Sequence, residues 1–242
     1  MAQHDYEGAA LRHFVPAREL ARWEVGIPDD DPRSLELALR LARALRLAGH
    51  TLAAEMLLEE TSASADDRTD LFARSLVEHG RLHRARGRAD AAVEAFHRAI
   101  NRALSSGDPG LMIETYLELG ELLTQQGREG KALEELAEGL LLSTKGEGEL
   151  AVDGPRNLWS LLFRLAELHG RRGDHRRSLV LAERALFHAR RGASAAGLAR
   201  CHLLLGRLFA AEGRPELARE NLTTARDPEI SWPDGAEQAR RL

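Results

Sequence analysis

The sequence has a single cysteine, very few lysines and no long apolar run. Cys201 cannot form a disulfide within the chain, so neither a disulfide framework nor a cysteine-based zinc site is available. The N-terminus carries acids where a secretory signal needs positive charge. Charged residues also interrupt every apolar stretch before the roughly 18 residues that a membrane span requires. These absences predict a soluble cytoplasmic protein without a membrane partner.

The composition excludes several further classes of protein. Of the 242 residues, 43% are hydrophobic, 30% charged and 5% aromatic, which is enough apolar material for a folded core and excludes collagen-like and strongly charged disordered chains. The 34 basic and 38 acidic residues give a formal charge of -4. A dedicated nucleic-acid binder carries a basic excess, so we expect no nucleic-acid partner.

The chain contains five copies of one pattern. Each copy has a run of helical period with a small residue near its middle, then a turn with glycine, then a second run with spaced alanines. The clearest copy extends from Leu76 to Ala99. The turn glycines recur at intervals of 38, 40, 46 and 40 residues, and they are Gly49, Gly87, Gly127, Gly173 and Gly213. This regularity predicts a repeat protein.

Both halves of each copy have the spacing of an amphipathic helix. In the second copy, Ala92, Ala95, Phe96 and Ala99 follow one another at i, i+3, i+4 and i+7. A turn glycine permits the left-handed backbone that ends the first helix, so the second helix must fold back antiparallel to it.

Three glycines lie inside the first helices instead of at the turns: Gly80, Gly120 and Gly206. Glycine within a helix costs about 1 kcal/mol relative to alanine. We therefore expect compensation from close packing, in which the absence of a Cβ lets two helices approach each other.

These residues resemble the tetratricopeptide repeat (TPR) family over roughly residues 34 to 226. The match is specific in the second, third and fifth copies. The first and fourth copies have Ala42 and Ala166 in place of the glycine within the helix, and Ser178 in place of an alanine. The spacing near 40 exceeds the family's common 34, as in variants that resemble kinesin light chains and bacterial regulator sensor modules.

The resemblance implies an all-α fold, a right-handed α-solenoid of about five antiparallel helix pairs. We expect the pairs at 31–61, 69–105, 109–144, 155–191 and 194–226. Residues 1–30, with a short helix ending at Trp23, are expected to cap one end, and the tail 227–242, with Trp232, to cap the other. Terminal repeats of a solenoid must shield a face that has no neighbour.

No motif in the sequence predicts catalysis. The segment from Gly127 to Lys131 lacks the spacing and the Ser or Thr of a P-loop. His79 and His83 have the i, i+4 spacing of a metal face, but they occupy packing positions between helices, and His169 takes the same place in its repeat as His83. Cys201 lies on an apolar helix, so we expect its side chain to be buried. We expect no catalytic residue, no cofactor and no metal.

The resemblance further implies that the first helices of successive pairs line a concave groove that holds a peptide or a partner helix. In this sequence the expected groove residues are Arg40, Arg43, Arg74, Arg81, Arg84, Glu114, Leu117, Glu118, Glu121, Phe163, Arg164, Glu167, Arg171, Arg200, Leu203 and Arg207. The asparagines and lysines of the carboxylate clamp of chaperone-binding members are not at the matching places.

Two interpretations of the groove charges remain open. In the first, Arg40, Arg43, Arg81 and Arg84 converge on one surface without enough acids nearby to neutralise them, which predicts that a partner presents acids to repeats one and two. In the second, the charges form a solvated helix face with internal Arg–Glu pairs, each worth at most about 1 kcal/mol.

The leading hypothesis is a non-catalytic bacterial scaffold or adaptor that binds another protein, through an acidic extended segment or helix, in its groove. No small-molecule substrate is expected for such a protein. The alternative is a regulatory module that senses a ligand or signal peptide and switches a partner regulator. An enzyme ranks third.

Overall fold

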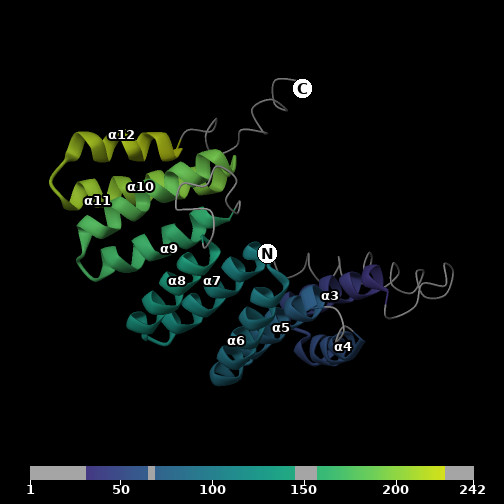
Figure 1. Ribbon diagram of the computed structural model, residues 1–242. Helices are drawn as coiled ribbons and strands as arrows, with labels where there is room; N and C mark the ends of the chain where they lie inside the picture. The colour runs from purple at the N-terminus through teal and green to yellow at the C-terminus, as the bar shows by residue number, and fades with distance from the viewer. Residues whose placement is uncertain (1–30, 65–68, 145–156, 227–242) are drawn as a thin grey trace, which may run out of the picture. The chain divides into compact units, whose positions relative to one another are not determined.

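The computed structural model describes residues 31–64, 69–144 and 157–226, and these contain ten α-helices and no strand (Figure 1). The prediction of an all-α chain is confirmed. The expected capping segments 1–30 and 227–242, with Trp23 and Trp232, lie outside the described residues. The chain divides into two compact units, residues 1–122 and 123–242, and each unit is described by itself.

Unit 1 contains the first helices of the series. Asp31 caps the first of them, because its side chain accepts a hydrogen bond from the Arg33 backbone N–H while Pro32 starts the helix without needing a partner. The last helix of the unit, α7, crosses into unit 2 by three residues. The helices of unit 1 are α3 (Pro32–Leu47), α4 (Thr51–Ser64), α5 (Thr69–Ala85), α6 (Ala89–Ser106) and α7 (Pro109–Gln125).

Unit 2 contains the remaining helices. Asp174 and Ser194 cap two of them, each through a side-chain oxygen that accepts from a backbone N–H three residues later. The helices are α8 (Glu129–Ser143), α9 (Leu158–Arg171), α10 (His175–Arg191), α11 (Ala195–Ala211) and α12 (Pro215–Arg226).

Consecutive helix pairs stack in sequence order within each unit. In unit 1, α3 packs on α4, α5 packs on α6, and α5 also contacts both helices of the first pair. In unit 2, α9 pairs with α10 and α11 with α12, while α8 contacts α9 and α10 contacts α11. The first helices of the two pairs in unit 2, α9 and α11, also contact each other. This order is the stacking expected for a helical repeat array.

The turn glycines adopt the backbone that the repeat pattern predicts. Gly87, between α5 and α6, has φ 72°, in the left-handed region that glycine enters without a steric penalty. The same region holds the other four turn glycines, Gly49, Gly127, Gly173 and Gly213.

The glycines within helices mark close helix contacts. A Cβ added at Gly80 would lie 2.4 Å from the ring of Phe96, so α5 and α6 meet at a distance that only glycine permits. At Gly206 an added Cβ would lie 2.7 Å from Leu222 of α12. The prediction of close packing is confirmed at these two positions.

The fourth pair uses a hydrogen bond where the repeat pattern departs from the family. Ser178 of α10 is fully buried, and its hydroxyl donates to the backbone carbonyl of Ala166 in α9 at 2.7 Å. Burying a hydroxyl without a partner would be costly, so this bond explains how serine replaces the usual alanine.

Across residues 31–64, 69–144 and 157–226, no helix combines the length and the apolar character needed to cross a bilayer.

Candidate interaction surface

A network of ion pairs links α3, α5 and α7 of unit 1. Arg81 of α5 contacts Glu78 on its own helix at 2.5 Å, and it reaches Glu114 at 2.5 Å and Glu118 at 2.8 Å on α7. Arg84 contacts Glu118 at 2.8 Å, and Arg46 of α3 contacts Glu78 at 3.3 Å. The first helices of three pairs are thereby connected by charged side chains, which we call the unit 1 ion network.

Arg81 is the centre of this network. Its side chain is buried, and burial alone would lower the pKa of its guanidinium, because the charged form is desolvated. The carboxylates of Glu78, Glu118 and Glu114 outweigh that effect and raise the pKa. Arg81 is therefore a cation whose charge is already satisfied inside the protein.

The expectation that the arginines of repeats one and two lack neutralising acids is wrong. Arg81 and Arg84 are paired with carboxylates that come largely from α7, one repeat further along the chain. Arg40 pairs with Glu36 on its own helix at 2.6 Å. Among these four arginines, Arg43 is the only one that forms no ion pair with a described residue, and its side chain is exposed. The interpretation of internal Arg–Glu pairs fits unit 1, but the pairs of Arg81 are buried within and between helices and do not form a solvated face.

A different surface lies on α9 and α11 of unit 2, and we call it the α9–α11 face. Arg200 of α11 stacks over the ring of Phe163 of α9, with its guanidinium carbon 4.6 Å from the ring centre. It also lies 6.0 Å from the ring of Trp159, which meets Phe163 edge to face. Aromatic side chains from one helix thus hold an arginine from the next in place.

The α9–α11 face carries more arginine than acid. Arg164 pairs with Glu167 at 3.0 Å, and Arg171 lies 3.8 Å from Glu129 of α8, which makes a long ion pair. Arg200 and Arg207 are exposed and form no ion pair with a described residue. Leu203 lies exposed between them on the same side of α11, since residues three and four apart share a face.

The remaining groove candidates fall into two kinds. Arg74 is exposed and lies 3.8 Å from Asp108, and Glu121 lies 3.8 Å from Arg84 in the unit 1 ion network. Leu117 of α7 is half-buried. Phe163, predicted as a contact residue, is buried beneath Arg200, so it supports the surface instead of forming it.

Solved structures provide the comparison, since no family model and no curated protein matches the sequence. The BtubC (BKLC) protein from P. vanneervenii is 22% identical with a TM-score of 0.72, over 97% of this chain and 93% of that one. A putative kinesin light chain from Podosopora anserina with nearly identical TPR-like repeats is 21% identical with a TM-score of 0.58, over 82% of this chain and 95% of that one. PilF of Pseudomonas aeruginosa is 18% identical with a TM-score of 0.59, over 99% of this chain and all of the other.

The chain has the TPR fold. At these identities the similarity concerns the fold alone. The α9–α11 face uses two first helices of the TPR array. Seven of its residues were predicted from the sequence, namely Phe163, Arg164, Glu167, Arg171, Arg200, Leu203 and Arg207, whereas the supporting role of Trp159 was not.

The histidines of the second TPR pair are packing residues. The rings of His79 and His83 stack with their centres 6.4 Å apart, and His79 Nε2 lies 3.1 Å from the Ser62 hydroxyl of α4. Burial lowers the pKa of both side chains. In residues 31–64, 69–144 and 157–226, no group of three or more potential metal-binding side chains comes together.

Cys201 is fully buried in α11, as its apolar neighbours predict. Burial raises the pKa of its thiol to about 12, and the nearby Arg200 only partly opposes this. The thiolate is the reactive form of cysteine, so a thiol with this pKa is inert at neutral pH.

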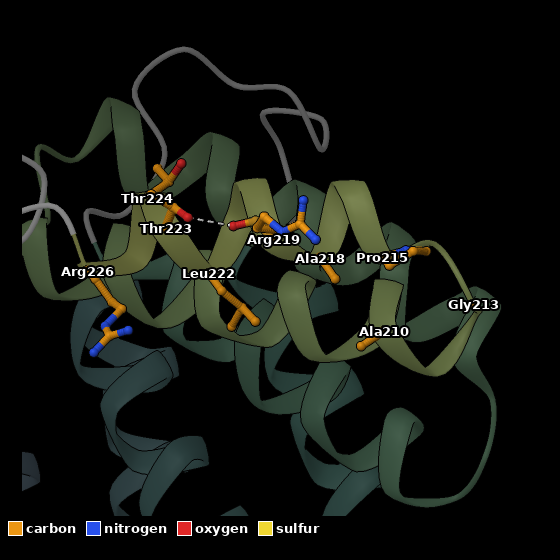
Figure 2. A pocket seen from close by; sticks show the side chains of 9 residues that line it. All are labelled: Ala210, Gly213, Pro215, Ala218, Arg219, Leu222, Thr223, Thr224 and Arg226. Carbon is orange, nitrogen blue, oxygen red and sulfur yellow. Dashed lines mark hydrogen bonds between the residues drawn. The ribbon is translucent and has the colours of Figure 1, made fainter.

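A surface pocket of about 1060 Å³ lies on the last TPR pair (Figure 2). Small and apolar side chains line much of it, and Arg219 and Arg226 belong to its lining. The only hydrogen bond drawn there joins the Thr223 hydroxyl, the donor, to the Arg219 carbonyl at 2.8 Å. No motif in the sequence pointed to this pocket. Its lining residues are Ala210, Gly213, Pro215, Ala218, Arg219, Leu222, Thr223, Thr224 and Arg226.

Proposed function

We infer that this chain is a non-catalytic interaction scaffold that binds an acidic segment of a partner protein on its α9–α11 face. The observation that carries the proposal is the difference between the two units. The arginines of the unit 1 ion network form ion pairs with carboxylates of the chain itself. Arg200 and Arg207, in contrast, form no ion pair with any carboxylate of the described residues.

The geometry of the α9–α11 face suits an acidic segment with an apolar residue between its acids. Arg200, Leu203 and Arg207 follow one another at i, i+3 and i+7 along α11, so a cation, an apolar side chain and a second cation lie in one row. Guanidinium groups bind carboxylates through two parallel hydrogen bonds. Arg200 is held by Phe163, so a partner loses little side-chain entropy in binding it.

The test is a selection of binders from a library of random peptides displayed on phage, with the full chain as bait at low salt. We expect the selected peptides to be rich in Asp and Glu around an apolar residue. The double variant Arg200→Glu, Arg207→Glu should weaken their binding by about tenfold or more, measured by fluorescence anisotropy. Raising the salt should weaken binding to the unchanged protein, because exposed charges are screened.

The matched control is the double variant Arg98→Glu, Arg219→Glu, which makes the same charge change at exposed positions on α6 and α12. It should retain binding. Selected peptides without acids, or an equal loss in both double variants, would contradict the assignment to the α9–α11 face.

The alternative of a ligand-sensing module has one observation in its favour, the pocket on the last pair. Its volume of about 1060 Å³ is at the upper end of small-molecule sites, and its lining is largely apolar with two arginines. A screen of small anionic metabolites for a raised melting temperature tests this alternative. A true ligand should lose its effect in Thr223→Trp, which fills the pocket from an exposed position.

A further inference from the structure

The outer face of α4 is apolar and acidic. Leu52 and Met56 are 66% and 65% exposed, and they lie one turn apart on the same side of the helix. Glu59 and Glu60 follow and are also exposed, and α4 contains no arginine or lysine. A helix with apolar side chains on its outer as well as its inner face is usually covered on both. No described residue covers Leu52 and Met56 in this structure.

The outer face of α10 is apolar and basic. Val180 is 52% exposed and Phe187 43% exposed, and they lie two turns apart on one side of the helix. One pair of exposed arginines precedes them, Arg176 and Arg177, and another follows, Arg190 and Arg191. Arg177 also contacts Asp174 at 3.4 Å, Arg191 stacks on the Phe187 ring at 5.6 Å, and Glu183 is the only acid in the helix.

On both faces a pair of like-charged residues lies three and four residues from a large exposed apolar residue. On α4, Glu59 and Glu60 lie three and four residues after Met56. On α10, Arg190 and Arg191 lie three and four residues after Phe187, while Arg177 and Arg176 lie three and four residues before Val180. A helix like α4 can therefore place Met56 on Phe187 or, in the opposite direction, on Val180, with its two acids against the adjoining arginine pair of α10.

We propose that α4 of one molecule docks on the outer face of α10 of a second copy of this chain. The proposal accounts for two exposed apolar surfaces of opposite charge with one contact. It is independent of the α9–α11 face, which lies on other helices. Each molecule offers one face of each kind, so the contact joins two different surfaces and not two copies of the same surface.

The affinity of this contact is modest. Each helix exposes only two large apolar side chains, which is far less surface than the roughly 1,200 to 2,000 Å² of a stable protein interface. The electrostatic part is screened by salt. Self-association therefore depends on protein concentration and is strongest at low ionic strength.

The chemistry of the α10 face favours this occupant over a nucleic acid or an anionic membrane. Both of those present negative charge continuously, which would meet the carboxylate of Glu183 between the two arginine pairs. A membrane-binding helix also needs a broad apolar face, whereas α10 exposes only Val180 and Phe187 as large apolar residues.

Sedimentation velocity over a range of protein concentrations at low salt tests the proposal on the full chain. The average mass should rise above the 26.7 kDa of one chain as concentration increases. Met56→Asp and Phe187→Asp, each at an exposed position, should both remain monomeric, because each removes one of the two complementary faces. Circular dichroism should show unchanged helix content in both variants.

Mixing the two variants provides the decisive measurement. Met56→Asp keeps its α10 face and Phe187→Asp keeps its α4 face, so the mixture should form a one-to-one dimer of twice the chain mass and nothing larger. A symmetric contact, in which α4 meets α4 or α10 meets α10, would not give this result. A mixture that stays monomeric overturns the proposal.

The matched control is Leu141→Asp on α8. Leu141 is 65% exposed and follows the exposed acids Glu134 and Glu138 on its helix face, so it resembles Met56 in exposure and charge. This variant should self-associate like the unchanged chain. The assignment is overturned if the unchanged chain is monomeric, or if Leu141→Asp loses its association. It is also overturned if the unchanged chain remains monomeric and instead binds anionic vesicles or nucleic acid, with this binding abolished in Phe187→Asp.

Discussion

Arg81 of α5 donates a hydrogen bond from its Nε to the carboxylate of Glu118 on α7 at 2.8 Å, although 37 residues separate them in the sequence. The turn glycines of these two repeats, Gly87 and Gly127, lie 40 residues apart, so Glu118 is the counterpart of Glu78 and lies almost one helical turn before the position equivalent to Arg81. The charge of Arg81 is therefore neutralised by carboxylates of the following repeat. For this reason we do not assign the binding of an acidic partner to the unit 1 ion network.

The unit 1 ion network should contribute to stability through Arg81. Replacing Arg81 with Met leaves Glu78 and Glu118 partly buried without their main partner, and breaking such a pair costs about 3 kcal/mol. Urea unfolding followed by circular dichroism measures the loss. Arg40→Met, which removes the exposed pair with Glu36, should cost about 0.5 kcal/mol or less. Equal effects of the two substitutions would show that the network is not energetically distinct.

The contact between Gly80 and Phe96 predicts intolerance to a single methyl group. Gly80→Ala should destabilise the protein by about 2 kcal/mol, because the new Cβ would overlap the aromatic ring and force α5 and α6 apart. Gly130→Ala is the control, since nothing lies within 4 Å of an added Cβ there, and it should stabilise α8 by roughly 0.5 kcal/mol. If Gly80→Ala also stabilised the protein, the close contact would not exist in solution.

The stacked histidines predict a decrease in stability on mild acidification. Burial holds the pKa of His79 and His83 below the ordinary 6.5, so the unfolded chain binds more protons than the folded one between those lowered values and about 6.5. The free energy of unfolding should therefore fall as the pH decreases from about 7 through this interval, and level off below it.

Chemical denaturation at a series of pH values measures this effect. The double variant His79→Asn, His83→Asn should show a smaller pH dependence, whereas His97→Asn, at an exposed position on α6, should keep the full dependence. An unchanged pH profile in the double variant would mean that the pair does not titrate as expected.

Cys201 should be unreactive in the folded protein. Its side chain is fully buried and its thiol has a pKa of about 12, so a thiol reagent such as DTNB at slightly alkaline pH has neither access nor thiolate to attack. We expect labelling to be at least about 100-fold slower in native buffer than in denaturant, limited by opening of the fold. Comparable rates under both conditions would contradict the burial of α11.

Local patterns in the sequence were sufficient for the repeat architecture. The recurrence of Gly87 and its equivalents specified where the chain turns, because no other residue enters the left-handed region so easily. Gly80 and Gly206 signalled close helix contacts, since glycine within a helix needs a structural reason. The positions of His79 and Cys201 on apolar helix faces correctly predicted packing roles.

The candidate surface could not be derived in the same way. The arginines of repeats one and two and the glutamates of repeat three were identified from their register, but register alone does not tell whether a guanidinium reaches a carboxylate on the neighbouring helix. The sequence likewise shows that Trp159 and Phe163 are aromatic, but it does not show that they lie beneath Arg200. That contact depends on the packing of α9 against α11.

Periodicity and glycine placement were enough to predict the all-α class, the helix pairing and the turns, because these depend on interactions between residues that are close along the chain. Which charges remain available to a partner could be learned only from the folded chain, since electrostatic pairing depends on distances of a few ångströms between side chains on different helices. That α4 and α10 carry uncovered apolar faces of opposite charge likewise follows only from the fold, because exposure is a property of the packed molecule.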